Sequence, residues 1–542
     1  MSTNTRQNLL THEVERRRTF AIISHPDAGK TTMTENLLLY GGAIHLAGSV
    51  KSRKAERHAT SDWMEIEKQR GISVTSSVMQ FEYEGNCINI LDTPGHQDFS
   101  EDTYRTLHAA DSAVMLLDGG RGVEQQTIKL FHVCRQRGIP IFTFINKMDR
   151  AAKNPFDLMD ELEKVLGIRS APINWPIGTH GDFKGVYDRQ RQEIDLFSAG
   201  AGHHGSKQAE LTAYRPDDPE LRKVLEQHYI DQLAEDIELL DIAGDPLDEE
   251  LVAAGLLTPL FFGSALTNFG VEPFLREFLR MAPAPAARKS NLGPVQPDDE
   301  AFSGFVFKIQ ANMNPQHRDR LAFIRICSGV FQPEMDATLT RTGRPVRLAR
   351  PQQIMAQERV SVTAAYAGDI VGVFDPGNFL IGDTIHDGSR GELAFEPIPA
   401  FAPEFFARIE PVNSLKRKQF LRGMNELVEE GTAQVFREPD AGTGSFIAGV
   451  VGKLQFEVLE YRLQNEYGVD VRLTHLPFRE ARWVRFAPDA ATTEAEKLNV
   501  TSTTLLVLDR NSDPVLLFES PWALDWALER NRGLQLLDIN AE

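Results

Sequence analysis

The sequence has few cysteines and no long apolar run. Its three cysteines, Cys87, Cys134 and Cys327, are far apart and form no CxxC pair. The spacing therefore indicates neither a zinc site nor a disulfide framework, and we expect a reducing, cytoplasmic setting. No apolar run approaches the roughly 18 residues that a membrane helix needs. The charged N-terminal residues show no secretory signal, so we expect no membrane partner.

Net positive charge is also lacking. The chain has 58 Lys and Arg residues against 77 Asp and Glu residues, a formal net charge of −19. Such a balance argues against a protein that coats nucleic acid through its overall charge, and we expect no DNA partner. Local basic faces are still compatible with RNA phosphates, although a solvated face explains such runs equally well. Two runs are candidates: Arg341, Arg344, Arg347 and Arg350, and Lys416, Arg417, Lys418 and Arg422.

Short apolar runs alternate with helical stretches through the first half of the chain. Near-continuous runs are typical of parallel strands covered on both faces, and the segments between them are long enough for crossover helices. The pattern predicts a multidomain α/β protein that begins with a doubly wound sheet. The expected strands cover 19–24, 86–92, 112–118, 139–146 and 258–264.

Composition shifts divide the chain into three predicted domains. Residues 1–285 form the doubly wound domain, and 286–301, rich in proline and polar residues, form a linker. Residues 302–394 change to period two with frequent turns, which predicts a small β-barrel. Residues 400–542 show the element order βαββαβ of an α+β domain, with a C-terminal extension. In the first barrel strand, Phe305, Phe307 and Ile309 are expected to share one face.

The first motif follows a predicted strand and opens a helix. It is Ser24, His25, Pro26, Asp27, Ala28, Gly29, Lys30, Thr31 and Thr32. In a P-loop, backbone N–H groups and the helix N-terminus hold phosphate oxygens. Lys30 should then reach the β- and γ-phosphates, and the Thr31 hydroxyl should bind Mg²⁺. Ser24 replaces the usual first glycine, and an ordinary strand–turn–helix is the alternative interpretation.

The second motif also follows a strand. It consists of Asp92, Thr93, Pro94, Gly95 and His96. Asp92 can hold Mg²⁺ through a water molecule. Gly95 permits close backbone approach, so its N–H can meet a γ-phosphate. A plain Thr-Pro-Gly turn is the alternative.

Two further motifs fit a guanine base. A carboxylate such as Asp149 accepts from N1–H and the 2-amino group, Asn146 can bond the O6/N7 edge, and the Lys147 stem can pack on the ring. A backbone N–H of the last motif can approach O6. These motifs are Asn146, Lys147, Met148 and Asp149, and Ser264, Ala265 and Leu266. Four motifs in this order, each at a strand end where open α/β sheets bind ligands, predict GTP or GDP with Mg²⁺.

With these motifs the chain resembles the translational GTPases. Residues 60–73, TSDWMEIEKQRGIS, are similar to the switch region of elongation factor G, with Ser73 where that family usually has Thr. The resemblance implies that Ser73 joins the Mg²⁺ site and that His96 positions water beside Lys30. It also implies an apolar gate of Pro26 and Ile72 and a monovalent cation near Asp27.

A narrower resemblance covers nearly the whole chain. Stretches such as SHPDAGKTT, DTPGHQDFSEDTYRTL, GFVFKIQANMNPQHRDR and GVVGKLQFEV resemble the bacterial class II release factors. That family implies a monomeric, ribosome-stimulated GTPase of translation termination. Its expected partners are ribosomal RNA, ribosomal proteins and, functionally, class I release factors, whose departure the GTP form promotes. Other ribosomal GTPases, translocase-like or ribosome-protecting, and a nucleotide-regulated ribosome-binding module remain alternatives.

Overall fold

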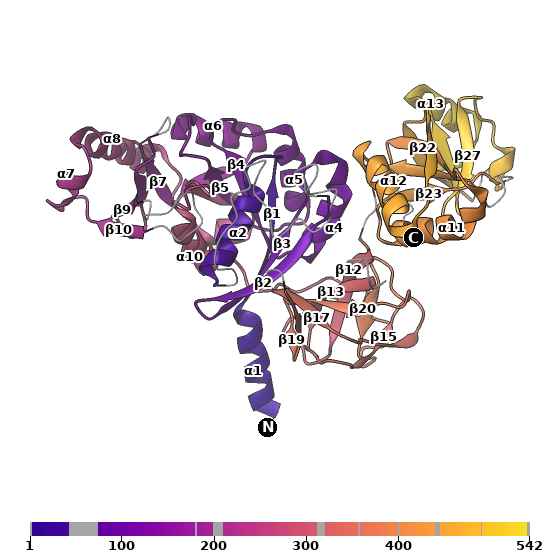
Figure 1. Cartoon of the computed structure of the whole chain (residues 1–542), viewed down its shortest axis with the longest axis horizontal. Coiled ribbons are helices and arrows are strands. Elements are labelled where there is room, and N and C mark those ends of the chain that lie inside the picture. Colours follow the sequence, from indigo (N-terminus) through magenta and orange to yellow (C-terminus); the bar gives the residue numbers. More distant parts are fainter. Residues whose placement is uncertain are drawn as a thin grey trace.

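The structure is a computed structural model that describes most of the chain. The described residues are 3–42, 74–178, 182–198, 210–311, 320–355, 358–398, 401–439, 445–488, 490 and 492–538. Figure 1 shows an N-terminal domain, a middle domain below it and a C-terminal domain at its side, while helix α1 (Thr3–Glu15) projects downward. None of the helices in the described part is long and apolar enough to span a membrane.

A seven-stranded sheet forms the centre of the N-terminal domain, in the order β2-β3-β1-β4-β5-β11-β6. All neighbours pair in parallel except β2, which pairs antiparallel with β3 at one edge. The five predicted strands are present, with ends that differ by up to two residues. The bounds are β1 Arg17–Ser24, β2 Ser77–Tyr83, β3 Asn86–Asp92, β4 Ser112–Asp118, β5 Ile141–Asn146, β6 Arg169–Pro172 and β11 Leu257–Phe262.

Helices cover both faces of this sheet because its strands are apolar on both sides. In β1, Phe20 and Ile22 pack toward one set of helices, whereas Ala21 and Ile23 pack toward the other. The first set is α2 (Lys30–Tyr40), α9 (Glu249–Ala253) and α10 (Val271–Met281). The second set is α4 (Ser100–Ala109), preceded by the turn η1 (Gln97–Phe99), α5 (Gln125–Gln136) and α6 (Pro155–Leu166). The doubly wound prediction is confirmed.

An insertion between β6 and β11 adds a second small sheet that the sequence patterns did not predict. Its strands follow the order β10-β9-β8-β7, and the indole N–H of Trp175 donates to Asp236 over 2.9 Å, which joins the sheet to helix α8. The elements are β7 Asn174–Ile177, β8 Gly185–Asp188, β9 Glu193–Ser198, β10 Glu210–Tyr214, α7 Leu221–Val224 and α8 Gln227–Ala243.

The middle domain is a curled antiparallel sheet, as predicted for a small barrel. The strand order is β16-β15-β21-β12-β13-β20-β17-β18, with β14 and β19 as a separate pair. The bounds are β12 Ser303–Ala311, β13 Arg320–Ser328, β14 Val330–Phe331, β15 Asp336–Leu339, β16 Arg344–Arg347, β17 Gln352–Met355, β18 Glu358–Ser361, β19 Ala365–Tyr366, β20 Ile370–Phe374 and β21 Thr384–His386.

The predicted shared face of β12 is wrong at one position. The register between β12 and β13 shifts between Val306 and Lys308, which marks a β-bulge at Phe307. Because a bulge inserts one unpaired residue, the side chains beyond it change faces. Phe305 and Phe307 therefore pack in the large core that includes the N-terminal domain, whereas Ile309 packs in the core of the curled sheet.

Buried ion pairs join the N-terminal and middle domains. Arg325 is paired with Asp111, and both side chains are 2% exposed. Arg17 Nε lies 2.8 Å from Asp369 Oδ2 in a second buried pair. The predicted linker also packs against this junction, since Arg288 donates to the His108 carbonyl over 2.7 Å.

The C-terminal domain contains the predicted βαββαβ order. Its strands form the antiparallel sheet β23-β24-β22-β25, and α11 and α12 cover one face through residues such as Phe420, Leu427 and Leu459. The bounds are β22 Phe405–Pro411, η2 Ser414–Lys416, α11 Arg417–Glu429, β23 Gln434–Phe436, β24 Phe446–Val450, α12 Leu454–Tyr467 and β25 Val471–Leu476.

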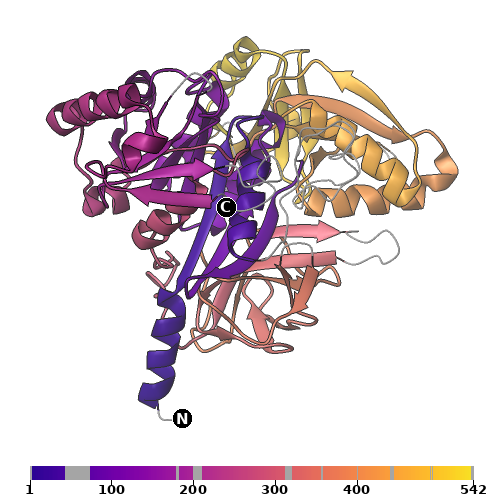
Figure 2. The same ribbon diagram turned by 60° about the vertical axis from the view of Figure 1, so that its left-hand side comes forward.

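A second sheet covers the other face of this domain. Trp483 and Leu517 pack there against Phe406 and Ile447 of the first sheet. The strand order is β27-β28-β26-β29. The elements are β26 Glu480–Phe486, η3 Ala495–Lys497, β27 Thr504–Leu508, β28 Pro514–Phe518, α13 Pro521–Arg530 and β29 Leu534–Leu537. Figure 2 shows the C-terminal domain beside the N-terminal domain, above the middle domain.

Candidate functional site

The segment between β1 and α2 makes a tight turn with two left-handed residues. Asp27 has φ 65° and Gly29 has φ 99°, and Gly29 directly precedes the first turn of α2. A Cβ at Gly29 would overlap the side-chain amide of Asn146, so only glycine fits there. Such a turn brings successive N–H groups together at a helix N-terminus, which is a site for phosphate oxygens.

The ammonium group of Lys30 connects this turn to the end of β3. Nζ lies 2.6 Å from Asp92 Oδ1 and also donates to the Thr93 carbonyl. The other Asp92 oxygen, Oδ2, is buried and has no hydrogen-bond partner among the described residues. A buried carboxylate oxygen suits a hard cation such as Mg²⁺, and Thr31 follows Lys30 as the second residue of α2, so these oxygen donors fit the predicted metal.

The loop that carries His96 lies against the P-loop. A Cβ at Gly95 would be 3.5 Å from Cα of Pro26, an ordinary contact that leaves little space between the two backbones. The Thr93 hydroxyl donates to the Ile22 carbonyl over 2.7 Å, which fixes the loop to β1. Nδ1 of His96 accepts from the backbone N–H of Asp98 over 3.2 Å. In a neutral imidazole the ring proton is then on Nε2.

Asn146 joins three loops. Its Nδ2 donates to the Ala28 carbonyl, and its Oδ1 accepts from the N–H groups of Lys147 and Ala265, each over 2.8 Å. The side chain that was expected at the guanine O6/N7 edge thus connects the P-loop, the Asn146–Asp149 loop and the Ser264–Leu266 loop. Its contact with a base stays a prediction.

Lys147 and Asp149 have further partners in these loops. Lys147 Nζ donates to the Asp27 carbonyl and to Asp118 Oδ2, each over 2.5 Å. Burial alone would raise the pKa of Asp118, but the bond from Lys147 and the Gly120 N–H together lower it. The Ser264 hydroxyl donates to Asp149 Oδ1 over 2.6 Å and orients that carboxylate.

The structure therefore gathers the four predicted motifs at the carboxyl edge of one sheet. Ile72 and Ser73 lie outside the described residues. The sequence patterns did not single out Asp118, which ends β4 and holds Lys147. The position of Asp118 in the sequence could have identified it because, like Asp92 and Asn146, it is a polar residue at the end of a buried strand.

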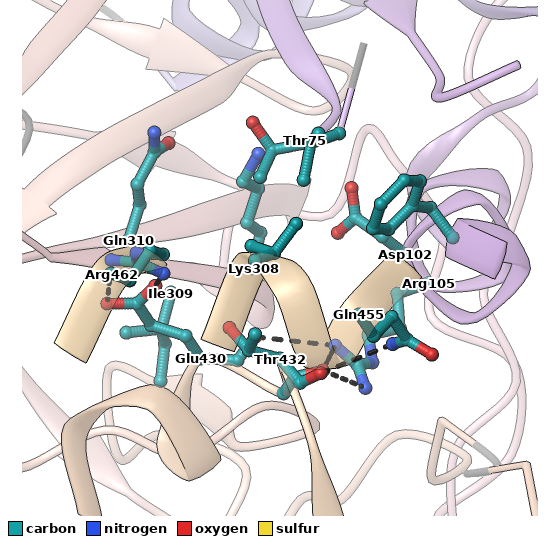
Figure 3. Close-up of a pocket in the computed structure, with 14 residues that line it drawn as sticks. Thr75, Asp102, Arg105, Lys308, Ile309, Gln310, Glu430, Thr432, Gln455 and Arg462 are labelled. Carbon is teal, nitrogen blue, oxygen red and sulfur yellow. Dashed lines mark hydrogen bonds and ion pairs between the residues drawn. The ribbon is translucent and has the colours of Figure 1, made fainter. Parts of the chain in front are cut away.

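A small cavity of about 50 Å³ lies where the three domains meet. Figure 3 shows Asp102 and Arg105 of α4, Lys308 of β12 and Arg462 of α12 around it. An ion pair of 2.5 Å between Glu430 and Arg462 forms one wall, and both side chains are buried. The segment after His96 thus contacts both of the other domains.

Family models match all three domains. The elongation factor Tu GTP binding domain matches residues 15–284, elongation factor G domain 2 matches 301–388, and the C-terminal domain of the class II release factor RF3 matches 395–528. A protein of known structure from Thermus thermophilus aligns with a TM-score of 0.67 at 23% identity. The alignment covers 87% of this chain and 71% of that one, and it shows the fold. Fold and site together define a P-loop GTPase of the translation-factor class.

Curated relatives are similar over nearly the full length. The peptide chain release factor 3 of Symbiobacterium thermophilum is 58% identical, covering 97% of this chain and 98% of the relative. The peptide chain release factor 3 of Cyanothece sp. is 53% identical, covering 99% of this chain and 98% of the relative. The peptide chain release factor 3 of Listeria monocytogenes is also 53% identical, covering 98% of this chain and 99% of the relative. The chain belongs to the peptide chain release factor 3 family.

Proposed function

We propose that this protein hydrolyses GTP on the ribosome during translation termination. One observation carries the proposal: Asn146 bonds the P-loop to both base-side loops, while Lys30 bonds the P-loop to the His96 loop. A guanine nucleotide that spans these loops would contact phosphate, base and catalytic groups at once.

The same residues account for the nucleotide and its metal. GTP or GDP would lie on residues 24–32 with its base toward Asp149. Mg²⁺ would be held by Thr31, by Ser73 and, through water, by Asp92, and it would neutralise charge on the β- and γ-phosphates. A monovalent cation near Asp27 would add positive charge beside the phosphates.

Hydrolysis requires a water molecule in line with the γ-phosphate. His96, with its proton on Nε2, can orient that water without acting as a strong base, and Lys30 stabilises the charge of the transition state. The reaction is slow in the free protein because an external partner must complete the placement of His96.

The role in termination is supported by the C-terminal domain and by the relatives' names. The GTP form engages a ribosome that carries a class I release factor and promotes departure of that factor, and hydrolysis then releases this protein. Its contacts would be ribosomal RNA and ribosomal proteins, and it would act as a monomer in the cytoplasm.

The test measures GTP hydrolysis with and without ribosomes that carry a fluorescent class I release factor. We expect ribosomes to stimulate hydrolysis, and GTP with this protein to accelerate loss of the bound factor. Stimulated hydrolysis without factor departure would favour another ribosomal GTPase. Nucleotide binding without stimulated hydrolysis would favour a regulated binding module.

A further inference from the structure

Asp98 connects the His96 loop to the C-terminal domain. Its Oδ2 accepts from the backbone N–H of Leu454 over 2.7 Å, and its Oδ1 lies 3.4 Å from Nδ1 of His96. The Asp98 side chain is 11% exposed, so this bond is sheltered from water. One residue therefore contacts both the predicted catalytic imidazole and a helix of another domain.

The contact at Leu454 acts as a helix cap. Leu454 is the first residue of α12, and Lys453 before it provides no side-chain cap. An aspartate at that place satisfies an N–H that the helix leaves without an internal partner, and its charge complements the positive end of the helix dipole. The N-terminal domain thus supplies the partner of the Leu454 N–H, whereas Gln455 of α12 itself accepts from the N–H groups of Val451 and Gly452.

Gly452 makes this approach possible. A Cβ at Gly452 would overlap Cα, Cβ and Cγ of Asp98. Because Cα belongs to the backbone and cannot rotate away, a larger residue must push the two domains apart. Nearby, Phe99 packs with Val74 and Val458 in a small apolar cluster that also crosses the domain boundary.

A second contact with the C-terminal domain lies at the other end of the segment 98–105, and here the N-terminal domain contributes a positive side chain instead of a negative one. Arg105 donates to the carbonyls of Glu430 and Gly431 over 3.4 Å (Figure 3). These carbonyls follow directly on α11, and a cation at a helix C-terminus is favourable. Asp98 and Arg105 thus meet the positive end of α12 and the negative end of α11. Arg105 is also paired with Glu101, and Arg320 of the middle domain pairs with Glu429 at the same end of α11.

We propose that Asp98 is a positioning residue that sets the placement of His96 according to whether α12 is docked. The inference rests on the proposed GTPase function. When α12 is docked, the Asp98 carboxylate is held by Leu454 N–H, so the Asp98 backbone N–H stays directed at His96 Nδ1. When α12 moves away, this restraint on the loop is lost and the imidazole loses its fixed orientation. Hydrolysis therefore responds to the position of the C-terminal domain.

The test compares Asp98→Ala with Asp98→Asn. Alanine removes the cap, and we expect ribosome-stimulated kcat to fall roughly 10- to 100-fold while the KM for GTP and the affinity for GDP stay constant. Asparagine caps helices about as well as aspartate, so Asp98→Asn should restore kcat to within about threefold. A residue with only a general structural role would not show this selective loss in kcat and its rescue.

Gly452→Ala tests the link from the C-terminal side. We expect a similar fall in kcat, and the double variant with Asp98→Ala should be no slower than either single variant because both break one contact. The control is Gly372→Ala in the middle domain, where the nearest atom to a new Cβ is 3.5 Å away; it should retain the parental rate.

The proposal is overturned if Asp98→Ala or Gly452→Ala keeps the parental kcat, or if Asp98→Asn is as slow as Asp98→Ala. A parental protein whose hydrolysis does not respond to ribosomes would instead contradict the proposed function. The same variants would then test the link on the intrinsic rate.

Discussion

Asn146 donates its side-chain amide to the Ala28 carbonyl over 2.8 Å, so the base-side loop and the P-loop are bonded directly to each other. Ala28 and Asn146 are 118 residues apart in the chain. Because the amide oxygen also accepts from Ala265, hydrogen bonds within the protein hold the phosphate and base halves of the site relative to each other. Such preorganisation lowers the entropic cost of binding.

Asp149→Asn should change base preference from guanine to xanthine. Xanthine has a carbonyl at C2, which a carboxylate repels and an amide can donate to. The Ser264 hydroxyl, which donates to Asp149 over 2.6 Å, would hold the asparagine oxygen in the same place. A binding competition between GTP and XTP measures the change. Unchanged preference for GTP would contradict the base-binding role of this loop.

His96→Ala should separate nucleotide binding from hydrolysis. The imidazole is bonded to Asp98, within its own loop and away from the base-side motifs, so GDP affinity should change little. Ribosome-stimulated hydrolysis should fall by roughly two to four orders of magnitude, because positioning supplies most of the catalysis in phosphoryl transfer. Lys30→Ala is the contrasting variant, in which GDP binding itself should weaken. If the His96→Ala variant hydrolysed GTP at the parental ribosome-stimulated rate, the catalytic role of His96 would be contradicted.

Ribosome binding should weaken as salt rises, despite the net charge of −19. Local cations that neutralise RNA phosphates release counterions, so log K falls with log salt. Lys418 is exposed at the start of α11, and Lys418→Ala should reduce that slope by about one. Arg341 is already paired with Asp383 over 2.7 Å, so Arg341→Ala should leave the slope unchanged. A titration that stays flat with salt would favour ribosomal proteins as the contact.

Asp195→Asn should remove a pH-dependent loss of stability in the inserted sheet. Burial, and then the neighbouring Asp188, raise the pKa of Asp195 to about 6. The folded state therefore keeps a proton that the unfolded chain releases, so the contribution of Asp195 to stability is greatest below about pH 4 and declines as pH rises through 6. At pH 7.5 the variant should be about 1–3 kcal/mol more stable than the parent.

Melting temperatures between pH 4 and 8 measure this difference. Glu238→Gln, at an exposed position of α8, is the control and should follow the parental curve. Parallel curves for Asp195→Asn and the parent would refute the assignment of this pH dependence to Asp195.

Local patterns predicted the parts of the fold that depend on neighbours in the chain. The apolar run at 112–118 appears as β4 with the same bounds, because a strand buried on both faces needs no alternation. Glycines in the motifs correctly indicated where two loops pass close to each other. Gly29 lies against the Asn146 side chain, and Gly95 lies against the backbone of Pro26. The βαββαβ order followed from periodicity alone.

Other features depend on distant residues and left no local signal. The bulge at Phe307 is set by pairing with β13, so period two in the sequence predicted the wrong face for Ile309. The inserted strands β7 and β8 have four residues each, too few for a clear pattern. The hydrogen bond between Asp98 and Leu454 joins residues that are 356 positions apart. It depends on how the two domains dock, which no local sequence pattern indicates.

The buried pairs between the N-terminal and middle domains have a mechanical consequence. Arg325 with Asp111 and Arg17 with Asp369 are almost closed to water, and uncoupling one such pair costs about 3–5 kcal/mol. We therefore expect the N-terminal and middle domains to move together as one rigid unit. The C-terminal domain is held to the segment 98–105 by a few hydrogen bonds and a small apolar cluster. It is held to the middle domain by the ion pair of Arg320 with Glu429 and by a bond from the Ala311 N–H to Glu430 over 2.9 Å. Because the contacts of the C-terminal domain are more exposed than the two buried pairs, we expect a rearrangement on GTP hydrolysis to change the position of the C-terminal domain and to leave those two pairs intact.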